Sequence, residues 1–206
     1  MKKSRLAILA SGSGRTICNI ASAIKKKEIH AEIALVILSS KKIPAVKRCQ
    51  ELELDTLIID KESYPTGAKK NDAILGAIYE SNADLTILAG WLHLLPIPPN
   101  LEGKVLNIHP SLLPEYGGKG FYGQKVHEAV FRDSKRISGC TIHFASQKYD
   151  EGPIVLQTPV IIEEEDTPEA IAEKVFKAET YSYPEAIKMV LEGYATYKDG
   201  KVVWDA

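Results

Sequence analysis

Short apolar runs alternate with longer amphipathic segments along this chain, and this alternation constrains the fold more than any other feature. The apolar runs predict strands at residues 6–10, 31–38, 56–59, 85–88 and 104–108. The segments between and after them predict helices at about residues 16–27, 45–53, 70–81 and 124–132. This order is typical of α/β proteins, so we expect a mostly parallel twisted sheet flanked by helices.

The C-terminal half departs from this order. Two further apolar runs, 140–145 and 154–162, are separated by the turn-rich residues Asp150-Glu151-Gly152-Pro153, which predicts an antiparallel strand pair. Thr167 and Pro168 predict the start of a last long helix, which Pro184 should kink or split. Because no linker or repeat interrupts the chain, we expect a single domain over residues 1–206.

The composition excludes several classes of protein. Hydrophobic residues make up 45% and charged residues 26% of the chain, and the net charge is -1. We therefore expect no nucleic-acid or membrane partner. The apolar run at residues 6–10 is shorter than the roughly seven residues of a signal-peptide core, so we predict a cytoplasmic protein. Three scattered cysteines indicate buried free thiols rather than disulfides or a metal site.

The turn Ser11-Gly12-Ser13-Gly14 lies between the first predicted strand and the first helix. Backbone N–H groups at such a helix start can bind an anion, and Arg15 adds a positive charge. A dinucleotide fingerprint would need a glycine at Ile17, and the lysine of a P-loop is absent. The turn is therefore compatible with a phosphate monoester or with a plain connection.

The segment 107–114, Asn-Ile-His-Pro-Ser-Leu-Leu-Pro, is the most informative in the chain. Asn107 and His109 are two residues apart on a strand and share one face, whereas Ile108 points into the core. The strand ends there, where α/β sheets bind ligands. An amide beside an imidazole can stabilise an oxyanion and transfer a proton, although loop backbone can equally satisfy both groups.

Asp150 begins the turn between the last two strands, where an Asx-turn is the ordinary expectation. If the loop folds back, its carboxylate can pair with His109. We then expect the pKa of His109 to rise above its usual ~6.5.

The segment 107–114, with Asp150-Glu151-Gly152-Pro153 some forty residues later, resembles the signature of the folate-dependent formyltransferases. The glycine turn and the Glu179…Tyr183-Pro184 element resemble the phosphoribosylglycinamide formyltransferase branch over nearly the whole chain. The resemblance implies a Rossmann-like fold and transfer of a formyl group from 10-formyltetrahydrofolate to the glycine amine of phosphoribosylglycinamide, in purine synthesis and without a metal. Asn107 would hold the formyl oxygen, His109 would donate a proton, and Asp150 would support the charged imidazole.

The resemblance also implies two sets of binding residues. The ribotide would be bound by Gly14, Arg15, Thr16 and Glu179. The folate would be bound by Leu92, His93, Leu94, Leu95, Asn107, Ser146, Gln147, Lys148, Tyr149 and either Lys69 or Lys70. Arg15-Thr16 and His93 depart from the family pattern. Each binding residue also has an ordinary structural reading, such as core for the leucines and a solvated helix face for Glu179.

The remaining histidines and three alternative functions complete the prediction. His143 shares a strand face with Thr141 and is expected to be structural, and His30 and His127 are expected at the surface. A 10-formyltetrahydrofolate hydrolase usually carries an additional N-terminal domain, and methionyl-tRNA formyltransferase a C-terminal RNA-contacting domain. A non-catalytic folate- or ribotide-binding module remains the alternative outside the enzymes. The expected partners are small-molecule substrates, with the protein a monomer or a homodimer.

Overall fold

The computed structural model describes residues 2–205, which fold into two compact units. The first unit comprises residues 2–96 and 104–106, and the second comprises residues 97–103 and 107–205. None of the helices among these residues combines the length and the apolar character needed to cross a membrane.

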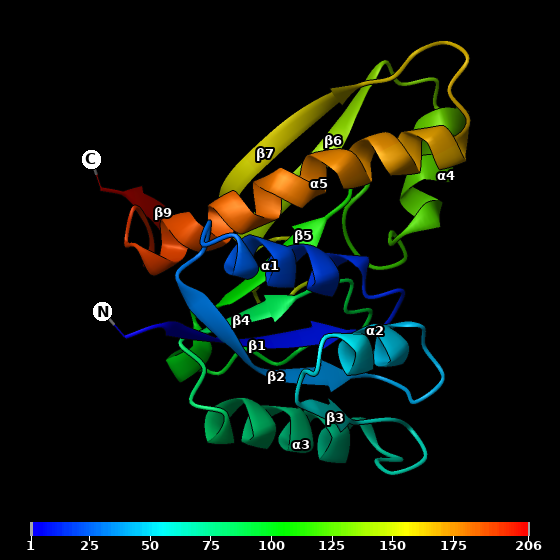
Figure 1. Cartoon of the computed structure of the whole chain (residues 1–206). Helices are drawn as coiled ribbons and strands as arrows, with labels where there is room; N and C mark the ends of the chain where they lie inside the picture. Colours follow the sequence, from blue (N-terminus) through cyan, green and yellow to red (C-terminus); the bar gives the residue numbers. More distant parts are fainter. Residues whose placement is uncertain (1, 206) are drawn as a thin grey trace. The chain divides into compact units, whose positions relative to one another are not determined.

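The first unit is built on parallel strands (Figure 1). Strand β1 (Ser4–Ala10) pairs with β2 (Ala31–Leu38) on one side and with β4 (Leu85–Leu88) on the other, and β2 pairs with β3 (Thr56–Ile58). Helices α1 (Arg15–Lys25), α2 (Ala45–Glu51) and α3 (Gly67–Glu80) connect these strands. Residues Leu6 to Ala10 are fully buried, as expected for a central parallel strand.

The second unit contains the antiparallel pair. Strand β6 (Ile137–Phe144) pairs with β7 (Ile154–Ile161), and helix α5 (Pro168–Leu191) packs on both. Helix α4 (Gln124–Arg132), the short 3-10 helix η1 (Pro99–Leu101) and the hairpin of β8 (Ala195–Lys198) and β9 (Lys201–Trp204) complete it. The first two residues of strand β5 (Val105–His109) belong to the first unit, and its last three belong to the second.

The strand order is β3-β2-β1-β4-β5-β6-β7, with β8-β9 as a separate pair. This confirms the predicted mostly parallel sheet with an antiparallel pair toward the C-terminus. The predicted bounds of β2, β4 and α4 match the structure, and the other predicted ends differ by a few residues.

Two predictions about the C-terminal region were wrong or incomplete. Helix α5 is one element with the buried Pro184 inside it, so the proline does not split the helix. The β8–β9 hairpin was not predicted at all. The start of α5 follows the prediction, because Thr167 accepts a hydrogen bond from the Ala170 N–H and Pro168 occupies the first turn.

Candidate active site

Strand β5 places Asn107 and His109 at its carboxyl end. Ile108 between them is only 8% exposed and packs into the core, as the alternation of side chains along a strand requires. His109 is 4% exposed, so its imidazole is largely removed from water. Asn107 is half-buried, so the two polar side chains that the sequence singled out share one face of the strand, where His109 is the more deeply buried.

Asp150 lies in the loop between β6 and β7, which folds back over the end of β6. Its backbone adopts a left-handed conformation with φ 58°. Gly152 permits the close approach of this loop, because a Cβ atom there would lie 1.7 Å from the carbonyl oxygen of Phe144. The fold thus requires glycine two residues after the carboxylate that it positions.

The carboxylate of Asp150 joins the two residues of β5. Its Oδ2 lies 3.4 Å from His109 Nδ1, and its Oδ1 accepts a hydrogen bond of 3.3 Å from Asn107 Nδ2. The backbone N–H of Gly118 donates to Oδ2 at 2.9 Å. Burial raises the pKa of the Asp150 carboxyl, but the neighbouring His143 and His109 and the Gly118 N–H outweigh burial, so the pKa lies below its ordinary value. Asp150 is therefore an anion near neutrality.

The imidazole of His109 is fixed at both nitrogens. Nε2 lies 2.7 Å from the carbonyl oxygen of Tyr116, and because a carbonyl only accepts, Nε2 carries a proton. Nδ1 then faces the carboxylate of Asp150.

The pKa predicted for His109 was wrong in sign. Burial lowers the pKa of His109, and this effect exceeds the rise caused by Asp150 and by the contact with Tyr116. The carboxylate acts in the expected direction. Desolvation of the imidazolium is the stronger effect at a side chain this deeply buried.

His143 was expected to be structural, and the structure also brings it into this cluster. Its Nδ1 donates to the carbonyl oxygen of Phe144 at 2.9 Å, which leaves Nε2 as an acceptor for Asn107 Nδ2 at 3.1 Å. The same Nε2 lies 3.7 Å from Asp150 Oδ1. The amide of Asn107 thus donates one N–H to His143 and the other to Asp150. The alternation of Thr141 and His143 along β6 was the only sequence signal for this contact.

A second histidine was misplaced by the sequence analysis. His127 of α4 is only 6% exposed, so the prediction of a surface position was wrong, whereas His30 is exposed as predicted. In α4, His127 lies on the apolar face of the helix with Val126 and Val130. Burial, and then the charge of His109, lower the pKa of His127 to about 4. His127 is therefore neutral at physiological pH.

The other predicted residues of the second unit lie in two places. In the β6–β7 loop, Gln147 donates to the carbonyl oxygen of Ile97 at 2.5 Å, and Lys148 pairs with Glu151 at 3.0 Å. Glu179 is half-buried on α5, and its charge, after burial itself, raises the pKa of the Cys140 thiol on β6 to about 12. Glu179 is therefore close enough to β6 for its charge to act on Cys140.

In the first unit, the glycine turn leads into α1 as predicted. Gly14 caps the helix with φ 80°, and a Cβ atom there would lie 2.9 Å from Ala45 of α2. The first turn of α1 has no acidic residue, so the positive end of its dipole is not offset there. The guanidinium of Arg48, which the sequence analysis missed, donates to the carbonyl oxygen of Ser13.

The predicted folate segment is also in the first unit. Leu92 and Leu94 are 46% and 41% exposed, so they are not core residues, whereas Leu95 is buried. The ammonium of Lys70 lies 5.3 Å from the centre of the Trp91 ring, which stacks edge-on against His93. Burial, and then the charge of Lys70, lower the pKa of His93. Of the two lysines left open by the sequence, Lys70 is the one beside this segment.

The arrangement in the second unit is suited to acyl transfer. It combines an anionic carboxylate, an imidazole whose Nδ1 faces that carboxylate, and an amide with two N–H donors. Such groups can move a proton and stabilise a developing oxyanion. Residues 2–205 contain no group of three histidine, cysteine or acidic side chains placed to hold a metal ion.

Known proteins resemble the chain over nearly its full length. A family model described as formyl transferase matches residues 4–187. The phosphoribosylglycinamide formyltransferase of Bacillus subtilis is 31% identical over 93% of this chain and 95% of that protein. The trifunctional purine biosynthetic protein adenosine-3 of Gallus gallus is 32% identical over 98% of this chain, which spans only 20% of that protein.

A solved structure agrees with these relatives. The glycinamide ribonucleotide transformylase 1 of Symbiobacterium toebii superimposes with a TM-score of 0.90 at 30% identity, covering 99% of this chain and 95% of that one. The cluster on β5, β6 and the β6–β7 loop thus occurs in a chain that is similar in both sequence and fold to formyl transferases.

Proposed function

Because the chain belongs to the formyl transferase family, we propose that it transfers the formyl group of 10-formyltetrahydrofolate to the glycine amine of phosphoribosylglycinamide, a step of purine synthesis. The observation that carries this proposal is the cluster of Asn107, His109 and Asp150, joined by His143. The family supplies the identity of the two substrates, and the cluster supplies groups for the chemistry.

In this reaction the amine forms a bond to the formyl carbon, and the bond from that carbon to the folate nitrogen breaks. One proton leaves the amine and one is gained by the folate nitrogen. The negative charge that develops on the formyl oxygen needs a donor, and Asn107 provides it by exchanging its longer hydrogen bond, the 3.3 Å contact with Asp150, for the substrate.

Proton transfer falls to His109 and Asp150. Nε2 of His109 donates a hydrogen bond to the Tyr116 carbonyl oxygen and keeps its proton. The proton that His109 can gain and lose is therefore the one on Nδ1, beside the carboxylate of Asp150. Asp150 favours the protonated imidazole of His109, whereas burial favours loss of the proton. An imidazole under these opposed influences can gain and lose a proton during turnover.

The ribotide phosphate is proposed to bind at the glycine turn. The uncompensated N-terminus of α1 supports this, together with Gly14, Arg15 and Thr16. Glu179 is proposed to contact the ribose. For the folate, the exposed apolar side chains of Leu92 and Leu94, with His93, Leu95 and the loop 146–149, supply contact area, and Lys70 rather than Lys69 supplies the positive charge.

We further propose a cytoplasmic protein that acts on small molecules, as a monomer or a homodimer, and that requires no metal. A screen of formyl acceptors tests the central proposal. The purified protein is given 10-formyltetrahydrofolate with phosphoribosylglycinamide, with methionyl-tRNA, or with water alone. We expect rapid transfer only to the ribotide. Formate released at the same rate with and without the ribotide would establish a hydrolase instead, and folate binding without turnover would establish a non-catalytic module.

A further inference from the structure

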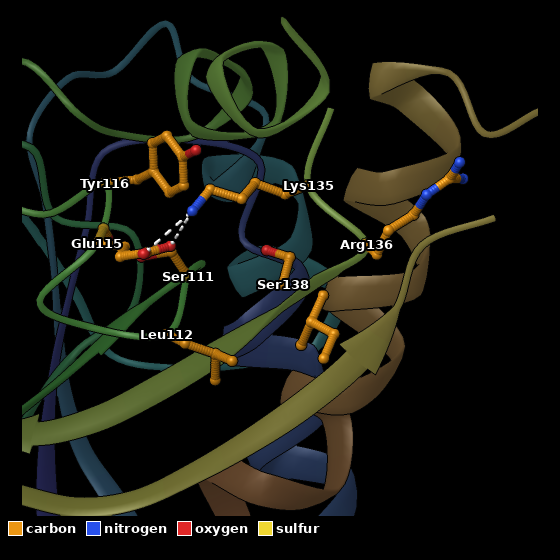
Figure 2. A pocket seen from close by; sticks show the side chains of 8 residues that line it. Ser111, Leu112, Glu115, Tyr116, Lys135, Arg136 and Ser138 are labelled. Atoms are coloured by element: carbon orange, nitrogen blue, oxygen red, sulfur yellow. Dashed lines mark hydrogen bonds and ion pairs between the residues drawn. The ribbon is translucent and has the colours of Figure 1, made fainter. Parts of the chain in front are cut away.

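A cavity of about 380 Å³ lies in the second unit, between the loop 111–116 and the segment 135–138 that leads into β6 (Figure 2). Its volume is at the lower end of the range for small-molecule sites, about 300–1,000 Å³. Apart from Tyr116, whose carbonyl oxygen contacts His109, none of its lining residues belongs to the catalytic cluster or to the residues proposed to bind the ribotide or the folate. The cavity therefore has no assigned role in formyl transfer.

A buried serine lines this cavity. Ser138 is 3% exposed, and its Oγ has no hydrogen-bond partner among residues 2–205. Its position is fixed because it pairs with Val160 of β7. In Figure 2 its oxygen points toward the side of the cavity where Lys135, Glu115 and Ser111 lie. Buried hydroxyls are nearly always hydrogen-bonded, so an occupant of the cavity is expected to supply the missing partner.

The charged groups at this cavity leave one donor for an anion. The ammonium of Lys135 donates to both carboxylate oxygens of Glu115, at 3.1 and 3.0 Å, and an ammonium has a third donor hydrogen. Arg136 adds a second cation at the rim, where it contacts Glu164 at 3.4 Å. Each cation is thus paired with a carboxylate, and the third ammonium hydrogen of Lys135 is the donor that remains for an anionic head.

The remaining walls are apolar or aromatic. Leu112 and Ile137 contribute aliphatic surface, and the ring of Tyr116 stands beside Lys135, whose ammonium is 5.9 Å from the ring centre. An inorganic ion would leave this apolar surface unused. A ligand that matches these walls has an apolar body, such as an aromatic ring, and an anionic head.

We infer that this cavity binds a small organic anion, a carboxylate or a phosphate on a single-ring body, whose head contacts Ser138 and Lys135. The ring lies against Leu112, Ile137 and Tyr116. This inference goes beyond formyl transfer, since it concerns neither substrate and requires no turnover.

Binding is tested by NMR on the full-length, ¹⁵N-labelled protein, without either substrate. The probes are benzoate and phenyl phosphate, and benzyl alcohol is their neutral counterpart. We expect saturable shifts of the backbone amides of Glu115, Tyr116 and Ser138 with the anions. Benzyl alcohol should bind at least about tenfold more weakly, since charge-assisted hydrogen bonds are roughly twice as strong as neutral ones. The tighter of the two anions identifies the head group as carboxylate or phosphate.

Two variants test the contacts. Ser138→Ala and Lys135→Met should each raise the Kd of the anion by about three- to tenfold, as expected for one hydrogen bond. Lys41→Met is the matched control, because Lys41 also pairs with a glutamate, Glu62 at 2.8 Å, but in the other unit. If Ser138→Ala fails to fold, Lys135→Met with its control still decides the question.

Three results would overturn the inference. The first is the absence of saturable shifts with either anion, which would mean that water alone satisfies Ser138. The second is equal affinity for benzyl alcohol and the anions. The third is an affinity that Lys135→Met changes no more than Lys41→Met does.

Discussion

His109 Nε2 lies 2.7 Å from the carbonyl oxygen of Tyr116, and this contact orients the imidazole so that Nδ1 faces Asp150. Tyr116 itself has a left-handed backbone, with φ 55°. A main-chain group, rather than a side chain, thus selects the tautomer of the central histidine.

Removal of either group on β5 should nearly abolish turnover. His109→Ala and Asn107→Ala should each lower kcat by at least ~10²-fold, typical for the loss of a proton-transfer group or an oxyanion donor. The two losses should not add in the double variant, because both groups act on one tetrahedral species. Steady-state kinetics would measure this, with His30→Ala at an exposed position as the control. Near-normal turnover in one variant would remove that residue from the mechanism.

Asp150→Asn should lower the pKa of His109 further. In the folded protein burial already lowers this pKa, and Asp150 is the main group that raises it. Without the carboxylate, less remains to counter the lowering of the His109 pKa by burial, so the imidazole should lose its proton at a lower pH. An NMR titration of His109 in both proteins would show the change. An unchanged or higher pKa would contradict the contact between the two side chains.

His127 should make the fold sensitive to acid. Its pKa is lowered to about 4 in the folded protein, whereas an unfolded chain binds this proton below about pH 6.5. Over that interval the unfolded state binds more protons, so stability falls as the pH falls. Between pH 7 and pH 4 the unfolding free energy should fall less in His127→Phe than in the unchanged protein, by up to about 3 kcal/mol. Urea unfolding at several pH values would measure it, and an unaltered pH dependence would mean that His127 is hydrated.

Gly152→Ala should destabilise the protein and disturb Asp150 together. A Cβ atom 1.7 Å from the carbonyl oxygen of Phe144 forces the loop outward, and we expect a loss of about 1–3 kcal/mol in unfolding free energy. Gly76→Ala is the matched control within α3, where the added Cβ meets nothing within 4 Å. That change should raise stability by roughly 0.5–1 kcal/mol. Equal effects of the two substitutions would refute the close approach.

Arg15→Ala should raise the KM for the ribotide and leave the KM for the folate nearly unchanged. A phosphate contact remote from the reacting atoms contributes mainly uniform binding, so kcat should change little. Initial-rate kinetics with each substrate varied would separate the two constants. Arg132→Ala, at an arginine of α4 that pairs with Asp133 on the surface, serves as the control. An unchanged ribotide KM would assign the phosphate to backbone N–H groups alone.

The sequence predicts the elements of this fold well where local signals agree. Helix α4 matches its predicted bounds, and the apolar runs of β2 and β4 have no competing interpretation. The β8–β9 hairpin carried a signal that was overlooked. Asp199 and Gly200 form a two-residue turn with positive φ at both positions, 48° and 77°, which is the preferred Asp-Gly connection of a hairpin.

The candidate site was less accessible from sequence, because its contacts are long-range. Strand alternation places Asn107 and His109 on one face, but it cannot show which side chains of other elements lie opposite them. His143 and the Tyr116 carbonyl join the cluster only through the pairing of β6 and the path of the loop 111–118. The sign of the pKa shift of His109 depends on the balance of burial against charge, and no sequence pattern reports that balance.

The last hairpin supports the strand that carries His143. The Tyr197 ring of β8 packs edge-on against buried Phe144, with ring centres 5.6 Å apart, and the Phe144 carbonyl accepts the hydrogen bond that sets the tautomer of His143. The match to the formyl transferase family ends at residue 187, before this hairpin begins. A recombinant protein trimmed to the family boundary would therefore lose a packing contact behind the proposed catalytic centre, and an inactive trimmed protein would say nothing against Asn107, His109 or Asp150.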